Sequence, residues 1–278
     1  MGRHKPRGGG RRGIVVPILF IVLGALAPAT GMAGSYFSAA PSMTTPRLAP
    51  AAAPLPDGRI LVVGGANEDG YLSSAEIFDP AARIFEPTSG SMTTARGGAA
   101  AAPLPDGRVL IVGGYANNGP GVRNSAEIFD PATGIFTATN PMGTPRRNPV
   151  AAPLPDGRVL VAGGSNDSTG TLSSAEIYNP WTGDFAPTGP LVTSRSSAAG
   201  AALSDGTVLI AGGSSAGIDQ GSAEMFHPSL GDFSLANGSM NTPRRDAPGA
   251  RLSDGEVLIV GGSDGSGRLS SAELYDPL

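Results

Sequence analysis

Short apolar runs, each bounded by turn residues, recur along this chain at a nearly constant interval. In PLPDGRVLIVGG, residues 103–114, an Asp-Gly pair precedes the apolar run and a Gly-Gly pair follows it. Asp-Gly between apolar segments indicates a β-hairpin, and an uninterrupted short apolar run is typical of a strand buried on both faces. Close copies occur five times, with the second glycine at positions 65, 114, 164, 213 and 262. The pattern predicts a repeated structural unit rather than a glycine loop that binds a ligand.

Each unit contains four segments with the composition of strands. In the second unit these are the Ala-rich 99–104, the apolar 108–112, the Ser-Ala-Glu-Ile-Phe run 125–129, and 135–139 after an Asp-Pro-Ala-Thr-Gly turn. Four strands in a period near fifty residues are typical of a propeller blade. Small residues suit the first strand, because the innermost strands of a propeller converge on its axis. The 42 Gly and 26 Pro residues agree with a turn-rich, all-β fold.

The combined signature resembles the Kelch repeat family. It consists of a glycine pair after an apolar strand, a Glu-aromatic strand with an Asp-Pro turn, a later aromatic residue, and an Arg that leads into the next unit. The resemblance covers residues 34–278 and implies a Kelch-type β-propeller of a bacterial type, with blade sequences similar to those of galactose oxidase. Phenylalanine replaces the family's usual Trp on the fourth strand and still supplies a large apolar anchor; the positions are Phe37, Phe85, Phe136, Phe185 and Phe233.

Five units predict five blades, and the two ends of the chain bear on how the ring closes. The fifth unit has no fourth strand after Asp276-Pro277, whereas residues 35–43 match residues 134–142 from the aromatic residue to the Met. We therefore expect a five-bladed propeller closed by pairing of the N-terminal strand with the last blade, which would remove the exposed sheet edges. Kelch propellers more often have six or seven blades, so a fragment or an unusually tight ring are the alternatives.

The N-terminal 33 residues have the layout of a secretory signal peptide. A basic head precedes an apolar stretch over 14–27, and small residues follow at two possible cleavage sites. Cleavage would release residues 34–278 as an exported domain. The alternative is an N-terminal membrane anchor, because residues 14–33 carry no charge and about 20 residues suffice to cross a bilayer. The basic head places the propeller outside the membrane in both cases.

Composition excludes several kinds of chemistry. The chain has no Cys, so disulfides and thiolate metal sites are excluded. A copper radical site like that of galactose oxidase needs two His and a Tyr bonded to a Cys, whereas His227 is the only His after residue 33. Beyond residue 33 the net charge is about −9, which argues against nucleic-acid binding. We expect no cofactor and no metal ion.

Candidate binding residues gather on one predicted face of the propeller. The connections from the second to the third strand differ strongly between units, and they share this face with the connections between units; recognition usually resides in variable loops on a rigid scaffold. One Arg per unit would ring the mouth of the central channel and could grip a carboxylate, sulfate or phosphate. The alternative is structural, because each unit also carries one Glu that could pair with its Arg. The candidates are Arg47, Arg96, Arg146, Arg195 and Arg244, with Tyr71 and Tyr115 as a stacking platform for a sugar.

These observations predict an exported, monomeric, non-catalytic binding module whose partner is a protein or an extracellular glycan. The alternative function is a carbohydrate-active enzyme, a glycosidase or lyase that uses loop carboxylates; the acids in question are Glu68, Asp69, Asp167, Asp219, Asp246 and Asp264. A third alternative is a bare scaffold or one part of a larger assembly.

Overall fold

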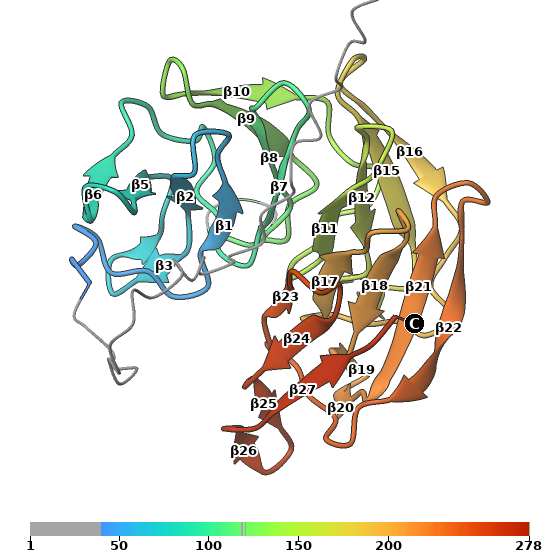
Figure 1. Cartoon of the computed structure of the whole chain (residues 1–278). Helices are drawn as coiled ribbons and strands as arrows, with labels where there is room; N and C mark the ends of the chain where they lie inside the picture. The colour runs from blue at the N-terminus through green and yellow to red at the C-terminus, as the bar shows by residue number, and fades with distance from the viewer. Residues whose placement is uncertain (1–39, 118, 120, 278) are drawn as a thin grey trace, which may run out of the picture.

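The computed structural model describes residues 40–117, 119 and 121–277 of the chain. Within them all regular structure is β, arranged as four four-stranded sheets, one three-stranded sheet and several small hairpins. Figure 1 shows these five blades following one another in chain order, from the blue first blade to the red last one. The prediction of an all-β propeller with five blades is therefore confirmed.

Four antiparallel strands build each of the first four blades, and the register is nearly the same in each. The first strands are β1 (Ala51–Pro54), β7 (Ala100–Pro103), β11 (Val150–Pro153), β17 (Ala199–Ala202) and β23 (Gly249–Arg251). The second strands are β2 (Ile60–Val63), β8 (Val109–Val112), β12 (Val159–Ala162), β18 (Val208–Ala211) and β24 (Val257–Val260). The third strands are β5 (Ala75–Asp79), β9 (Ala126–Asp130), β15 (Ala175–Asn179), β21 (Ser222–His227) and β27 (Ala272–Tyr275). The fourth strands are β6 (Ile84–Pro87), β10 (Ile135–Thr139), β16 (Asp184–Thr188) and β22 (Asp232–Ser239).

The first strands are the innermost, since β1, β7, β11, β17 and β23 each contact the next in this order. Their small side chains let these strands approach one another, as the Ala-rich pattern predicts.

Two-residue strands form hairpins inside four of the connections between the second and third strands. They are β3 (Ala66–Asn67) with β4 (Gly70–Tyr71), β13 (Ser165–Asn166) with β14 (Gly170–Thr171), β19 (Ser214–Ser215) with β20 (Ile218–Asp219), and β25 (Ser263–Asp264) with β26 (Gly267–Arg268). Single bridges such as Leu48 to Ala66 and Arg147 to Ser165 tie each hairpin to the connection that enters the same blade. The two kinds of variable connection therefore lie on one face, as predicted; we call it the loop face.

Four apolar cores hold the blades together, one at each joint between successive blades. We call the side of a blade that packs on the preceding blade its leading face and the other side its trailing face. At the first joint, Leu61 and Ile77 on the trailing face of blade 1 pack with Val109 and Phe129 on the leading face of blade 2, and all four are buried. Burying a side chain of this size stabilises the fold by about 1.5 to 3 kcal/mol, so the joints are the main source of stability.

The fifth blade has three strands within the described residues, in the order β23-β24-β27. The N-terminal strand that we expect to complete this blade, like the signal peptide or anchor over 1–33, lies outside the described residues. Closure by that strand therefore stays a prediction. No helix of the described chain is long and apolar enough to cross a membrane.

Candidate functional site

The side chain of the repeated Arg is buried in every unit rather than displayed on the loop face, and in units 2 to 5 it lies at a joint between blades. Arg96 is representative: its main chain lies against blade 1, where its amide donates to the Leu72 carbonyl and its carbonyl accepts from Gly65. Its side chain enters blade 2 and donates to the carbonyl oxygens of Gly113 and Ser125 at 2.8 Å each. The residue therefore fastens two blades together.

A carboxylate of the third strand completes each of these sites. Glu127 accepts from Nη2 of Arg96 at 2.9 Å and from the amides of Thr93 and Thr94 at 2.7 and 3.2 Å. The other four units repeat the ion pair at 2.7–3.2 Å, between Arg47 and Glu76, Arg146 and Glu176, Arg195 and Glu224, and Arg244 and Glu273. Each Glu thus binds both the guanidinium group of the Arg and the backbone amides of the connection that leads to that Arg.

This arrangement corrects the predicted placement of the five arginines at a channel mouth. Each guanidinium-bearing side chain is at most 1% exposed, and its Nη atoms donate to protein acceptors. Burial lowers the pKa of Arg96, although the charge of Glu127 opposes this shift. Burial raises the pKa of Glu76, but hydrogen bonds from Thr44, Thr45 and Arg47 outweigh it and hold the pKa below its ordinary value. The geometry supports the structural alternative, and ligand binding by these groups stays an untested prediction.

The glycine pairs are part of the same joints. Gly113 has φ +71°, and a Cβ atom there would lie 2.3 Å from the carbonyl oxygen of Arg146. Gly163 has φ +64°, and its Cβ would lie at the same distance from the Arg195 carbonyl oxygen. A side chain would therefore clash with the Arg of the next unit, which explains why glycine recurs at this position.

The two predicted tyrosines do come together on the loop face. Tyr71 of β4 and Tyr115 in the corresponding connection of blade 2 meet edge to face, with ring centroids 5.4 Å apart. The guanidinium carbon of Arg147 lies 5.8 Å from the Tyr115 centroid, and Nη1 of Arg147 lies 3.9 Å from a carboxylate oxygen of Asp167. Stacking of guanidinium on an aromatic face is favourable. These four side chains form a continuous row across blades 1 to 3, which we call the Tyr-Arg row.

Arg147 is the member of this row that our sequence analysis did not select. It directly follows the buried Arg146, but its own side chain is 42% exposed. The repeat contains a signal for Arg147, because the residue after the buried Arg is not constant. It is Leu48, Gly97, Arg147, Ser196 and Arg245 in the five units. Variation next to an invariant position marks a side chain that the scaffold does not require.

Four of the six loop acids proposed for an enzyme have carboxylates in local contacts, namely Asp167, Asp219, Asp246 and Asp264. Asp219 pairs with Arg245 at 2.7 Å and Asp167 with Arg147 at 3.9 Å, while Oδ1 of Asp264 accepts from the amide of Ser266. Within the described residues, no three His, Asp or Glu side chains gather in a way that could hold a metal ion.

Comparisons with known proteins agree with the repeat and the fold. The family described as "Kelch motif" matches residues 47–89, 146–191 and 244–278. A solved structure entitled "Structure of YjhT" superposes with a TM-score of 0.70 at 12% sequence identity, covering 83% of this chain and 84% of that one. At this identity the likeness concerns the fold alone. No curated protein matches the chain.

Proposed function

This chain is a Kelch-repeat β-propeller, and from that premise we propose that it is an exported, non-catalytic module that binds a protein or an extracellular glycan through its loop face. The Tyr-Arg row of Tyr71, Tyr115, Arg147 and Asp167 forms the centre of the binding surface. The propeller itself is consistent with a binding module, since a rigid scaffold here carries connections that differ from blade to blade.

The observation that carries the proposal is that the row breaks the symmetry of the repeat. The structural Arg, Glu and Gly positions recur in every unit, whereas a Tyr occurs in this connection only in blades 1 and 2, and the position of Arg147 carries an Arg in one other unit, as Arg245. Tyr and Arg are enriched among the residues that dominate binding energy at protein interfaces, and aromatic rings also stack on the apolar faces of sugars. A recognition surface needs such an asymmetric feature, and a scaffold does not.

The engaged loop acids favour binding over the carbohydrate-active enzyme. Asp167 and Asp219 each face an Arg, and Asp264 stabilises its own turn. Each of these three carboxylates already has a protein partner, which favours a structural role over the acid or base role that glycoside hydrolysis requires.

A binding screen on the chain against secreted proteins and glycan arrays tests the proposal, with two variants and one matched control. Tyr115→Ala and Arg147→Ala are each expected to weaken a specific hit about fivefold or more, because truncation of a Tyr or Arg at the centre of an interface costs more than about 1 kcal/mol. Arg158→Ala is the control, since Arg158 is 37% exposed and pairs with Asp156 on the opposite face. A hit that depends on Arg158 and ignores Tyr115 and Arg147 would contradict the proposal.

Export is tested separately on the secreted fraction. Mass spectrometry of the mature N-terminus is expected to find cleavage within residues 27–34, near one of the two small-residue sites. An intact N-terminus in a membrane fraction would instead support the anchor.

A further inference from the structure

Arg147 on the loop face is held in place but keeps part of its capacity for hydrogen bonds. Its amide and carbonyl groups pair with Ser165 at 2.9 Å each, and its Nε donates to the Ser165 hydroxyl at 3.1 Å. Its guanidinium carbon lies 5.8 Å from the centroid of the Tyr115 ring. Within the described part of the chain, neither Nη atom donates to a protein acceptor, since the Asp167 oxygen that faces Nη1 is 3.9 Å away. The two Nη groups are therefore fixed in position and open to a ligand.

The equivalent Arg of blade 5 is already occupied by a partner within the protein. Arg245 also pairs through its main chain with a serine, Ser263, but its Nη1 donates to Oδ1 of Asp219 in blade 4 at 2.7 Å. Asp219 lies five residues before the Glu of its third strand, and the residue with this spacing in blade 2 is Val122. Because the valine side chain has no acceptor, blade 2 does not capture Arg147 in the way that blade 4 captures Arg245.

A tyrosine ring and a carboxylate border the same small space beside Arg147. A Cβ atom at Gly121 would lie 3.2 Å from Cε2 of Tyr115 and 3.1 Å from Oδ2 of Asp167. Glycine at position 121 therefore keeps this space open. The Asp167 side chain is 61% exposed, and an ionised carboxylate only accepts hydrogen bonds, so a ligand that contacts it must carry a donor.

These groups together define the chemistry of the ligand. Two adjacent Nη groups of an Arg match the two oxygens of a carboxylate. An aromatic ring offers an apolar surface for C–H groups, and the Asp167 carboxylate accepts from a hydroxyl group. An acidic sugar carries a carboxylate, hydroxyl donors and an apolar ring face within one residue. The side chain of a peptide Asp or Glu carries the carboxylate but has no hydroxyl group beside it.

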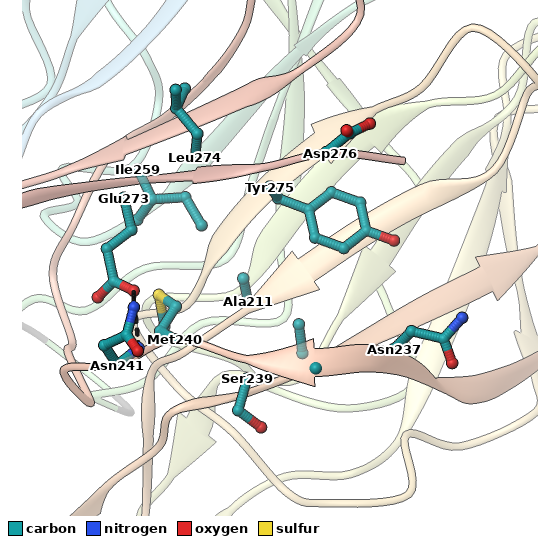
Figure 2. A pocket seen from close by; sticks show the side chains of 12 residues that line it. Ala211, Asn237, Ser239, Met240, Asn241, Ile259, Glu273, Leu274, Tyr275 and Asp276 are labelled. Carbon is teal, nitrogen blue, oxygen red and sulfur yellow. Dashed lines mark hydrogen bonds between the residues drawn. The ribbon is translucent and has the colours of Figure 1, made fainter. Parts of the chain in front are cut away.

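The groove between β22 and β27 does not have the groups that such a ligand requires. It encloses about 230 Å³, and Figure 2 shows Glu273 and Asp276 among the side chains that line it. Of the described residues that line this groove, none is an Arg or a Lys. The groove therefore offers a carboxylate no cation to bind, and the loop face does.

We infer that the Tyr-Arg row binds an acidic sugar residue, a hexuronate, whose carboxylate accepts from both Nη groups of Arg147. The apolar face of the sugar then packs on Tyr115, and one of its hydroxyl groups donates to Asp167. Ser165 is a positioning residue in this site, because its hydroxyl holds Nε of Arg147 and thereby directs the two Nη groups. This inference rests on the proposed function, since it names the ligand class of the same surface.

Isothermal titration calorimetry with defined uronates tests the inference. The probes are trigalacturonate and trimannuronate, each beside its methyl ester, which keeps the sugar rings but removes the negative charges. At least one uronate is expected to bind, and its ester to bind roughly tenfold more weakly or not at all. Arg147→Ala is expected to weaken uronate binding roughly tenfold or more, because it removes two charge-assisted hydrogen bonds. Arg147→Lys keeps the charge but not the planar group, so it should recover only part of the affinity.

Asp167→Asn and Arg245→Ala make the test specific to this site. Asp167→Asn keeps an acceptor for the hydroxyl group but removes a negative charge beside the ligand carboxylate. It is therefore expected to strengthen uronate binding by up to about fivefold and to leave binding of the ester unchanged. Arg245→Ala is the matched control, because Arg245 stands at the same repeat position but is held by Asp219. It is expected to leave uronate affinity unchanged.

Several results would overturn the inference, and they differ from those that would contradict the proposed function. Equal binding of the acid and its methyl ester would show that the carboxylate is not recognised. Equal losses in Arg147→Ala and Arg245→Ala would show that the attraction is not specific to this site. Binding of triglutamate in place of both uronates would replace the sugar by an acidic protein segment. If neither uronate binds, the inference fails, whereas the proposed function stands if the binding screen yields a neutral ligand that depends on Tyr115.

Discussion

Replacing Arg146 by Ala should destabilise the propeller severely, whereas replacing its neighbour Arg147 should not. The Arg146 guanidinium group donates to the carbonyl oxygens of Gly163 and Ser174 at 2.9 and 2.7 Å, to the Ser174 hydroxyl at 3.0 Å, and to Glu176 at 3.0 Å. Its side chain is fully buried. Truncation leaves three protein groups without their donor and a buried carboxylate without its counter-charge.

The size of the effect follows from the Glu that remains. Removing one partner of a buried ion pair typically costs about 3 to 5 kcal/mol, and a single hydrogen bond to a charged group contributes about 1.5 to 3 kcal/mol. Glu176 keeps the Gly143 and Thr144 amides at 2.7 and 3.1 Å, which limits the loss. We therefore expect Arg146→Ala to lower the free energy of unfolding by about 3 to 5 kcal/mol.

Arg147→Ala serves as the matched control, because it removes the same side chain one residue away. Its partly exposed pair with Asp167, at 3.9 Å, is worth at most about 1 kcal/mol. Urea unfolding followed by circular dichroism measures both variants against the parent chain. Arg146→Lys provides a further check, since it keeps the charge but not the planar fork, and should recover only part of the loss. Equal destabilisation by Arg146→Ala and Arg147→Ala, or a loss below about 1 kcal/mol for Arg146→Ala, would refute the structural role of the repeated Arg.

Two further predictions concern the glycines and the carboxylates of the joints. Gly163→Ala should destabilise the propeller far more than Gly58→Ala in the same urea assay. Both glycines have positive φ, but a Cβ atom at Gly163 would lie 2.3 Å from a carbonyl oxygen, whereas a Cβ atom at Gly58 would have no atom within 4 Å. Similar losses of stability in the two variants would contradict the steric explanation. Because the pKa of Glu76 is lower in the folded chain than its ordinary value of 4.5, its contribution to stability is present above that value and lost as the pH falls through the folded pKa. Glu76→Gln should therefore flatten the decline in melting temperature below about pH 4.5, and an unchanged slope would show that this carboxylate is not responsible.

The strands could be predicted from sequence because the apolar runs and the turn residues that bound them indicate the same strand positions. The run at 108–112 is apolar and bounded by an Asp-Gly turn and a glycine pair, and β8 covers Val109–Val112 with all four residues buried. The segment 135–139 was bounded by turn residues and is β10 without any shift. The small hairpins such as β3 and β4 were missed because two-residue strands are too short to show a periodicity.

The burial of the repeated arginines was harder to predict, because any hydrophobicity pattern predicts that an Arg in a connection between two strands is exposed. The signal lay in the matching repeat of a Glu in the third strand, which gave one carboxylate per guanidinium group. It could not show that Gly113 and Ser125 point their carbonyl oxygens at Arg96, since that geometry depends on how two blades pack. Side-chain composition determines which partners are available, and only the packed joint determines where they meet.

The difference between repeated and unrepeated positions therefore separates stability from recognition in this chain. Any residue that the joint geometry requires must recur once per blade, because all joints are built alike, and Arg96 and Glu127 obey this rule. The position of Tyr115 carries no aromatic residue in the other units, and that of Arg147 carries an Arg in only one other unit, so the joints require neither side chain. It follows that substituting Arg96 reports on folding and substituting Arg147 reports on the loop face. A binding experiment that used the buried arginines alone would measure unfolding and mistake it for a lost ligand contact.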